Sequence, residues 1–267
     1  MIKKSIRNFL QKKELYYPLK YSRWFGIYQA LFRREAIEQQ RAEISFYKSF
    51  LPACKLIFDI GANDGHKTTA FLALSDKVIC CEPDGENFKL LRVRFRDQEK
   101  RVVIENMALS DKDGFAEMHI HHPGSAFNTL SSKWMKLLED QGESRWNESI
   151  KFTRNETVQT TTLDQLIVKY GRPDFIKIDV EGFEEHVLKG LSLPVPYLSF
   201  ETLVPDYNIE LQNCLNAIEV LDRNAKYNFA ANEKLILPDY VSRYELEHRL
   251  KTSDQAQSFE VIVKMTA

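Results

Sequence analysis

Short apolar runs alternate with segments of helical periodicity from residue 55 onward, and this alternation limits the possible fold more than any other feature. Apolar runs that are continuous rather than alternating are typical of strands covered on both faces. Strands separated by helices pair in parallel, because a crossover helix carries the chain back to the starting edge of the sheet. We therefore predict an α/β fold around a mostly parallel, doubly wound sheet.

The positions of the strands and helices follow from this pattern. The predicted strands are residues 55–60, 78–82, 102–106, 175–179, 197–201 and 259–264, and the predicted helices are residues 67–74, 87–97, 163–169, 184–191 and 210–224. A further segment, 115–121, alternates apolar and polar residues, which is typical of an added hairpin strand.

Two segments depart from the alternation. Residues 1–50 carry many Lys, Arg and aromatic residues without a strand pattern, which predicts a basic, helical N-terminal extension before a domain of residues 51–267. Ile44, Phe46, Tyr47 and Phe50 predict a helix that packs onto that domain. Residues 123–158, with two Trp and many Ser and Asn, form a long excursion, and such segments are usually lids or binding segments. We interpret them as a variable lid or acceptor-binding segment.

Composition excludes several classes of protein. The net charge of -1 gives no general attraction to nucleic acid, so we expect no nucleic-acid partner. No apolar run approaches the roughly 20 residues that a membrane-spanning helix needs. The basic N-terminus lacks the apolar core of a secretory signal. The cysteines, Cys54, Cys80, Cys81 and Cys214, form no C-x-x-C pair, which favours reduced packing residues and a cytoplasmic location.

The basic N-terminus leaves two interpretations open. Ile2, Ile6, Phe9 and Leu10 can form an apolar stripe on a basic helix, and such a helix can lie on an anionic membrane surface. The alternative is a solvated leading arm, since runs of charge usually lie in water.

The segment "IFDIGANDGHKTTAF", residues 57–71, predicts a ligand-binding loop between a strand and a helix. Gly61 and Gly65 can let the backbone approach a ligand without a Cβ in the way, with Ala62 and Asn63 between them. The middle glycine of the dinucleotide fingerprint G-x-G-x-x-G is missing. Asp59, just before the loop, suits the ammonium group of an amino acid better than a diphosphate.

The next two predicted strands add a nucleoside site. Glu82 ends "KVICCEP", and an acidic residue about 20 positions after the loop typically bonds ribose hydroxyls. The turn in "IENMALSD", with Asn106, Ala108 and Leu109, can hold adenine. A ligand with a nucleoside, an amino-acid tail and no phosphate is S-adenosylmethionine, which is the predicted cofactor.

The fourth predicted strand makes a family resemblance specific. The sequence resembles the FkbM-type methyltransferases in "FDIGANDG" at 58–65, "EP" at 82–83, "NMALS" at 106–110, "TLD" at 162–164 and "KIDVEGFE" at 177–184. The resemblance covers roughly residues 55–205. It implies a Rossmann-like class I methyltransferase fold and a role for Asp59, Gly61, Asn63, Glu82, Asn106 and Asp179 near the cofactor or the active site. It also implies methyl transfer from S-adenosylmethionine to a hydroxyl of a saccharide, glycoconjugate or related natural product.

Three carboxylates are the main candidates for chemistry. Asp179 and Glu181 alternate to one side of "IDVEG", and Glu201 ends the next strand in "SFET". An alcohol is a poor nucleophile, so a base or a metal must help to remove its proton. We interpret Asp179 as a neighbour of the methionine part or the acceptor, and Glu181 and Glu201 as residues that orient the acceptor or act as base. The alternative is that Glu181 caps the following helix and Glu201 pairs with a lysine.

Histidines and tryptophans supply further candidates. His119 and His121 share one face in "MHIHH", a spacing compatible with two metal ligands, although a solvated hairpin face explains them too. We predict no metal site and keep His121 as a candidate base. Trp134 and Trp146 can stack on a sugar or anchor the lid.

The predicted function is thus S-adenosylmethionine-dependent O-methylation of a small-molecule or glycan acceptor. One alternative is a nicotinamide-dependent oxidoreductase on a related fold, against which the missing G-x-G-x-x-G argues. The other is a non-catalytic binding module, against which the presence of Asp59, Glu82 and Asp179 argues.

Overall fold

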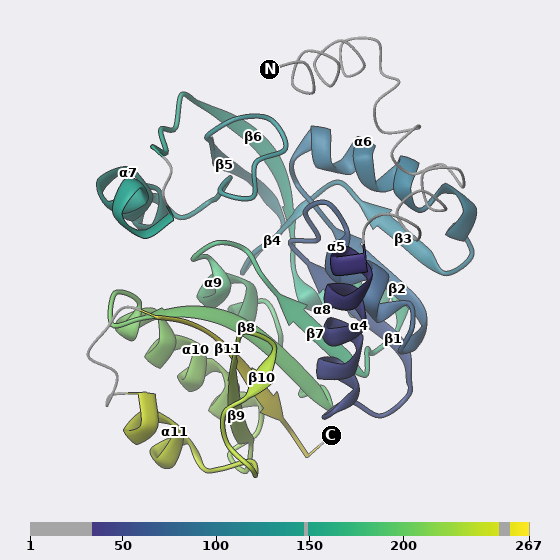
Figure 1. Ribbon diagram of the computed structural model, residues 1–267, viewed down its shortest axis with the longest axis vertical. Coiled ribbons are helices and arrows are strands. Elements are labelled where there is room, and N and C mark those ends of the chain that lie inside the picture. The colour runs from purple at the N-terminus through teal and green to yellow at the C-terminus, as the bar shows by residue number, and fades with distance from the viewer. Residues whose placement is uncertain (1–33, 147–148, 251–256, 267) are drawn as a thin grey trace.

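The computed structural model describes residues 34–146, 149–250 and 257–266. Its centre is a sheet with the strand order β10-β9-β11-β8-β7-β1-β2-β3 (Figure 1). The strands are β1 (Cys54–Ile60), β2 (Ser75–Cys81), β3 (Val102–Glu105), β7 (Phe175–Ile178), β8 (Tyr197–Val204), β9 (Lys226–Ala231), β10 (Lys234–Leu235) and β11 (Gln257–Lys264). From β8 to β3 every neighbouring pair is parallel, whereas β11 runs antiparallel to β8 and β9. The predicted α/β fold with a mostly parallel sheet is confirmed.

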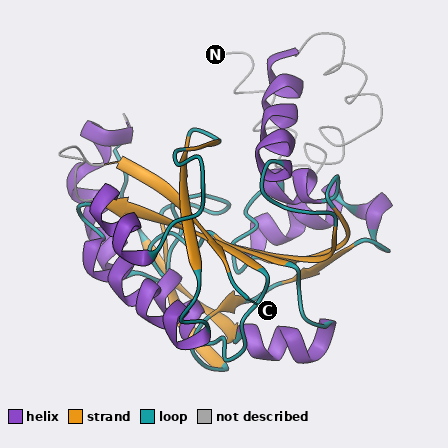
Figure 2. Cartoon of the chain, turned by 90° about the horizontal axis from the view of Figure 1, so that it is seen from below, coloured by secondary structure: helices purple, strands orange, loops and turns teal. Residues whose placement is uncertain are grey.

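Helices cover both faces of this sheet, as a doubly wound arrangement requires (Figure 2). One face packs against α4 (Arg34–Lys48), α5 (His66–Phe71) and α6 (Gly85–Arg94). The other packs against α8 (Leu163–Tyr170), α9 (Glu184–Lys189), α10 (Asn208–Leu221) and α11 (Arg243–Leu250). All four residues of β7 are buried because both faces of the strand are covered, and three of the four are apolar, the exception being Lys177.

Helix α4 belongs to the core of this unit. Phe46 is 5% and Tyr47 is 0% exposed, and the Tyr47 ring lies 4.8 Å from that of Phe71 and 5.9 Å from that of Phe175. The basic stretch before α4, with its proposed membrane face, lies outside the described residues. Within the described part of the chain, no helix is long and apolar enough to cross a membrane.

A second, smaller sheet lies beyond the first, with the order β4-β6-β5. It consists of β4 (Ala108–Leu109), β5 (Gly114–Ile120) and β6 (Arg154–Thr161), and α7 (Ser132–Trp146) lies beside it (Figure 1). The 115–121 hairpin strand is present as β5, which pairs antiparallel with β6. The end of the 123–158 excursion forms the start of β6 and not part of a lid. This strand was not predicted because its side chains alternate between the small sheet and solvent, so the strand has no continuous apolar run.

Besides β4, β6 and α7, the elements β9, β10 and α11 were absent from the prediction. Strand β9 carries a buried Asn228, whose amide donates to the carbonyl oxygen of Leu237 and accepts from its N–H. This polar residue interrupts the apolar pattern. Helix α11 reads "RYELEHRL" and buries only Leu246 and Leu250, so its sequence has little apolar periodicity.

Candidate active site

A cleft with an empty volume of about 680 Å³ opens at the carboxyl ends of β1, β2 and β7. Ligand sites of parallel sheets lie at this edge. The cleft, called the first cleft below, is lined by many of the residues predicted to bind a cofactor, namely Gly61, Asn63, Glu82, Ala108, Leu109 and Asp179. Met107, Met118 and Phe183 add apolar surface. The fold therefore brings most of the predicted cofactor residues to one place.

The glycines of the loop after β1 serve a different purpose from the predicted one. Gly61 and Gly65 have positive φ values of 80° and 77°. A Cβ on Gly61 would overlap the carbonyl group of Asp179, and a Cβ on Gly65 would meet Leu91 and Phe95 within 3 Å. The glycines are thus required by neighbouring protein atoms. Only Gly61 lines the first cleft, whereas Gly65 precedes α5 as its N-cap.

Asp59 does not face the first cleft, contrary to the prediction. It is 1% exposed and accepts a hydrogen bond of 2.5 Å from the Thr68 hydroxyl of α5. Burial raises the pKa of Asp59 to about 6, although the hydrogen bond from Thr68 and the charge of Lys177 oppose the shift. Successive side chains of a strand point to opposite faces, and this register turns Asp59 beneath the loop. Ala62, 4% exposed, is likewise buried and does not line the cleft.

Glu82 stands at the end of β2 and ties two loops together. Its Oε2 accepts from the N–H of Asn63 at 2.7 Å, and its Oε1 accepts from the N–H of Asp84 at 2.9 Å. Burial raises the pKa of Glu82 to about 7, against these two backbone hydrogen bonds. Asn106 does not line the cleft; its amide donates to the carbonyl oxygens of Glu82 and Pro83 and so supports the turn behind the carboxylate.

Residues 122–131, called the roof segment below, extend over the first cleft. Asp84 caps α6 and also accepts hydrogen bonds from the N–H of Gly124 at 3.1 Å and the amide of Asn128 at 2.8 Å. At the other end, the Thr129 hydroxyl donates to the carbonyl oxygen of Glu181 at 2.7 Å. The roof segment is therefore fixed to the strand-end loops of both β2 and β7.

A second cleft, with an empty volume of about 630 Å³, adjoins the first. Asp179 and Glu181 line both clefts. Aromatic side chains of Phe127, Trp134 and Tyr207 form part of its wall, and the Trp134 and Tyr207 rings meet edge to face at 5.3 Å. Two more acidic residues, Glu184 and Glu201, also line it. The second cleft combines flat apolar surface with carboxylates.

The carboxylates at the boundary have different environments. The Lys177 ammonium lies 3.3 Å from Asp179 Oδ2 and 3.2 Å from Glu201 Oε1. Burial and the charge of Glu201 raise the pKa of Asp179 to about 7. The charge of Lys177, opposed by burial, lowers the pKa of Glu201. Burial and the neighbouring carboxylates raise the pKa of Glu181 well above its ordinary value.

Comparisons with known proteins identify the family of the chain. The family model of the methyltransferase FkbM domain matches residues 59–200, more than half of the 267 residues. The chain belongs to the FkbM methyltransferase family. The match begins at Asp59 and ends one residue before Glu201, so it contains the loop, Glu82 and the "KIDVEG" segment.

Two relatives of this FkbM protein illustrate the extent of the likeness. The 2-O-methyltransferase NoeI of Sinorhizobium fredii (strain NBRC 101917 / NGR234) is 30% identical over 141 residues, which are 51% of this chain and 56% of that protein. The chain thus spans little more than half of the length of NoeI. The crystal structure of methyltransferase FkbM from Methylobacillus flagellatus KT has a TM-score of 0.50 at 15% identity, over 83% of this chain and 47% of that chain. At this identity the likeness shows the Rossmann-like fold.

Three residues of the FkbM site were missed by the sequence analysis. Lys177 appeared only as part of a strand, although a lysine between isoleucines in "FIKID" is a signal of a paired, buried charge. Glu184, rather than Glu181, takes the capping position, since its Oε1 accepts from the N–H groups of Val180 and Gly182. Tyr207, placed after β8, carried no local signal. Glu201 pairs with Lys177, as the alternative interpretation predicted, and it also lines the second cleft.

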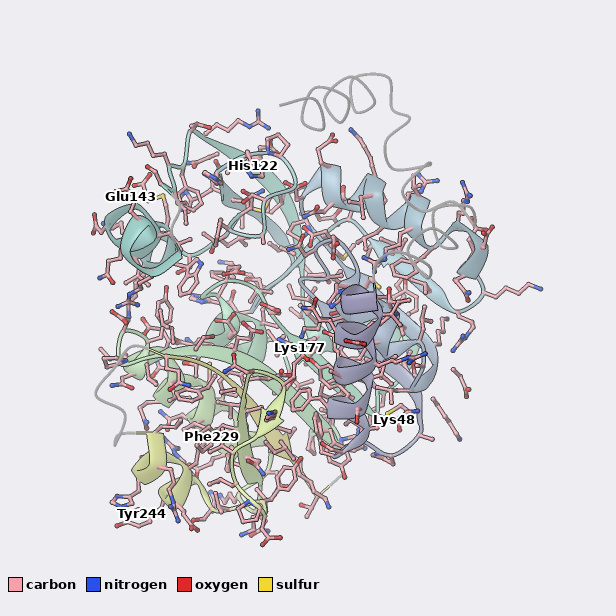
Figure 3. All side chains as sticks on the ribbon, in the orientation of Figure 1. Lys48, His122, Glu143, Lys177, Phe229 and Tyr244 are labelled. Atoms are coloured by element: carbon pink, nitrogen blue, oxygen red, sulfur yellow. The ribbon has the colours of Figure 1, made fainter. Side chains whose placement is uncertain are left out.

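His121, predicted as a candidate base, lines neither cleft of the FkbM site. Its Nδ1 lies 2.8 Å from the carbonyl oxygen of Lys151, and its ring packs beside Phe127 and Phe152. His119 bonds Asn155 and Ser132 through its two ring nitrogens. Figure 3 shows His122 at the end of the molecule that carries β5 and β6, away from Lys177. His119 thus joins β5 to Asn155 of β6 and to Ser132 at the start of α7. Trp134 lines the second cleft, and the Trp146 side chain lies outside the described residues.

Proposed function

We propose that this protein is an S-adenosylmethionine-dependent O-methyltransferase. The observation that carries the proposal is the shared boundary of the two clefts, at which Asp179 and Glu181 line both. Methyl transfer needs the cofactor and the acceptor to be bound side by side, with the acceptor oxygen in line with the methyl carbon. This positioning accounts for much of the rate. Two adjoining clefts with carboxylates between them meet that need.

The residues of the first cleft fit S-adenosylmethionine. Each oxygen of Glu82 accepts one backbone hydrogen bond and keeps a further lone pair, which suits ribose hydroxyls. Ala108, Leu109 and Met118 offer an apolar wall for adenine. Asp179 offers a carboxylate for an ammonium group at the other end. When bound, S-adenosylmethionine supplies a methyl group on a positively charged sulfur.

The residues at the boundary can prepare the acceptor. A general base works best when its pKa lies near the working pH, and the pKa of Asp179, at about 7, meets that condition. Glu201, held ionised by Lys177, can accept a hydrogen bond from a second hydroxyl of the acceptor. Ser125, Ala126 and Thr129 of the roof segment line the first cleft, and closure of such a segment over bound ligands would exclude water and strengthen each charge interaction there.

The second cleft suits a saccharide or a related polyhydroxylated compound. Trp134 and Tyr207 offer flat surfaces on which the apolar face of a sugar ring can lie, and the carboxylates accept from its hydroxyls. The name of NoeI specifies a 2-O-methyltransferase. We extend to this chain only the acceptor class, a hydroxyl group. The nicotinamide-dependent alternative is disfavoured by membership in a methyltransferase family.

Binding measurements and methyl transfer test the proposal together. S-adenosylhomocysteine should bind the wild-type chain in calorimetry, and Glu82→Gln should weaken binding by about 1.5–3 kcal/mol, because a charge-assisted hydrogen bond is lost. Glu105→Gln is the matched control, since Glu105 ends the neighbouring β3 but pairs with Lys169 outside both clefts. Asp179→Asn should weaken binding of the cofactor product through the lost ammonium contact and, at saturating cofactor, transfer labelled methyl to saccharide acceptors about 10²–10⁴ times more slowly.

Each contrary outcome identifies one of the alternatives. Stabilisation by a nicotinamide cofactor, without any by S-adenosylhomocysteine, would replace the proposal with an oxidoreductase. Tight binding of S-adenosylhomocysteine with no transfer to any hydroxyl acceptor would indicate a binding module.

A further inference from the structure

Lys177 is a charged residue in the centre of the fold. It lies in β7 between β1 and β8, pairs with Asp59 on one side and Ser199 on the other, and is 0% exposed. Figure 3 shows it near the middle of the molecule. A lysine is almost never fully buried unless it is paired, because burial removes the hydration of its charge. Its partners therefore explain why it is there.

Both ion-pair partners of Lys177 belong to the candidate active site. The ammonium lies within 3.3 Å of oxygens on Asp179, two residues further along its own strand end, and on Glu201 of β8. The two carboxylates line the second cleft, with their side chains 25% and 40% exposed. Lys177 thus contacts both carboxylates from the protein interior and itself lines neither cleft.

Several other charges face this group from the surrounding elements. The charge of Glu260 in β11 raises the pKa of Lys177, and the Tyr47 hydroxyl of α4 bonds Glu260. For Asp59 in β1, the charge of Lys67 in α5 lowers the pKa and that of Glu43 in α4 raises it. Glu181 and Glu184 are further acidic residues of the site. Acidic groups outnumber the two lysines in this set. Burial alone would lower the pKa of Lys177, but the carboxylates raise it well above its ordinary value, so the ammonium stays charged. Lys67 is itself paired with Glu43 at 2.8 Å, which leaves Lys177 as the cation in contact with Asp179 and Glu201 among the described residues.

We propose that Lys177 is a positioning residue that holds Asp179 and Glu201 at one spacing and divides their tasks, with Glu201 kept ionised and Asp179 left free to accept a proton. This inference rests on the proposed function for the meaning of those tasks. One cation shared by two acids cannot neutralise both, and the second acid then titrates against the charge of the first. The two carboxylates differ in this sense, since the charge of Lys177 is the leading cause that lowers the pKa of Glu201, whereas burial and the charge of Glu201 raise the pKa of Asp179.

The test measures the titration of both carboxylates without cofactor or acceptor. The full chain, labelled with ¹³C at Asp and Glu carboxyl carbons, is followed by NMR over pH, with Asp179→Asn and Glu201→Gln used to assign the signals. In Lys177→Met both titration midpoints should move up by about one pH unit or more, because an opposite charge within hydrogen-bond distance has been removed. Lys169→Met, which breaks an ion pair of Glu105 outside both clefts, should leave both midpoints in place.

A second pair of variants covers the case in which Lys177→Met does not fold. Lys177→Met with Glu201→Gln removes a cation together with its anion and keeps the charge balance of the interior. The Asp179 midpoint in this double variant should lie about one pH unit above that in Glu201→Gln alone. Equal midpoints in either comparison would overturn the inference.

Activity then separates this inference from the proposed function. With a working acceptor, the acid limb of the pH profile of kcat should move to higher pH in Lys177→Met by the same amount as the Asp179 midpoint. Shifted midpoints in a chain that does not bind S-adenosylhomocysteine would end the methyltransferase proposal and, with it, the tasks assigned here. Unmoved midpoints in a chain that binds it and transfers methyl groups would overturn the role of Lys177 alone.

Discussion

Gly61 and Asp179 are in direct backbone contact: a Cβ placed on Gly61 would stand 1.8 Å from the carbonyl oxygen of Asp179. The contact joins the loop after β1, which lines the first cleft, to the strand end that carries the candidate base. The N–H of Asp179 also donates to the carbonyl oxygen of Ile60 at 2.9 Å. The spacing between cofactor loop and base is thus fixed by main-chain atoms.

Gly61→Ala should therefore destabilise the fold by roughly 2–5 kcal/mol, the sum of a left-handed backbone and a steric overlap. Denaturant unfolding measures the change. Gly85→Ala is the control, since Gly85 begins α6 and a Cβ added there would have no neighbouring atom within 4 Å. This control should be neutral or stabilising by up to about 1 kcal/mol. Similar effects of both changes would show that the Gly61 contact is not tight.

Asp84→Ala should release the roof segment. Asp84 is 3% exposed, caps α6 and holds Gly124 and Asn128, so its loss should cost roughly 2–4 kcal/mol. Amide hydrogen exchange in residues 122–129 should accelerate more than in the rest of the domain. Thr162→Ala removes a helix cap from α8 without contact to the roof segment and should leave that exchange unchanged. Equal acceleration in both variants would contradict the tether.

Glu184→Gln should change how stability depends on pH. Burial raises the pKa of Glu184 to about 7 from 4.5, so the folded state favours the protonated carboxyl. The contribution is fully present below pH 4.5 and is lost as pH rises through 7. The free energy of unfolding of wild type, relative to Glu184→Gln, should then fall by up to about 3 kcal/mol between pH 4.5 and 8.

The neighbouring Glu185 provides the control for that experiment. It pairs with Lys189, and the resulting hydrogen bond, together with one from Asn213, outweighs burial and lowers its pKa. Its contribution is therefore constant above pH 4.5, and Glu185→Gln should show a flat difference from wild type over the same range. A flat difference for Glu184→Gln as well would mean that its carboxyl is not held protonated.

Trp134→Phe should separate the two clefts. Trp134 lines the second cleft but not the first. Affinity for S-adenosylhomocysteine should stay unchanged in calorimetry, while KM for the acceptor should rise about tenfold, which corresponds to about 1.4 kcal/mol of lost ring contact. An unchanged KM would place the acceptor elsewhere.

The strands that could be predicted from the sequence are those in which most consecutive residues are apolar. Strands β1, β2 and β7 are buried on both faces, so "LIFDI", "VICC" and "FIKI" identified them. Strand β6 is polar on one face, and β9 contains Asn228, so neither had a distinct local pattern. Their positions depend on pairing partners distant in the sequence.

The same limit applies to the candidate site. Glu82 and Asp179 both line the first cleft, because carboxyl ends of parallel strands meet at one edge. The predicted direction of the Asp59 side chain was wrong, since one residue of register decides which face a side chain takes. The role of Lys177 requires the neighbour β8, which brings Glu201 beside it, and no local pattern contains that register.

The roof segment, fixed to Asp84 at one end and to Glu181 at the other, makes the two clefts parts of one thermodynamic system. A ligand that shifts the roof segment in one cleft changes the free energy of binding in the other. Linkage is reciprocal, so the factor by which cofactor improves acceptor affinity equals the factor by which acceptor improves cofactor affinity. The strength of this coupling therefore depends on a ten-residue loop as well as on the ligands themselves.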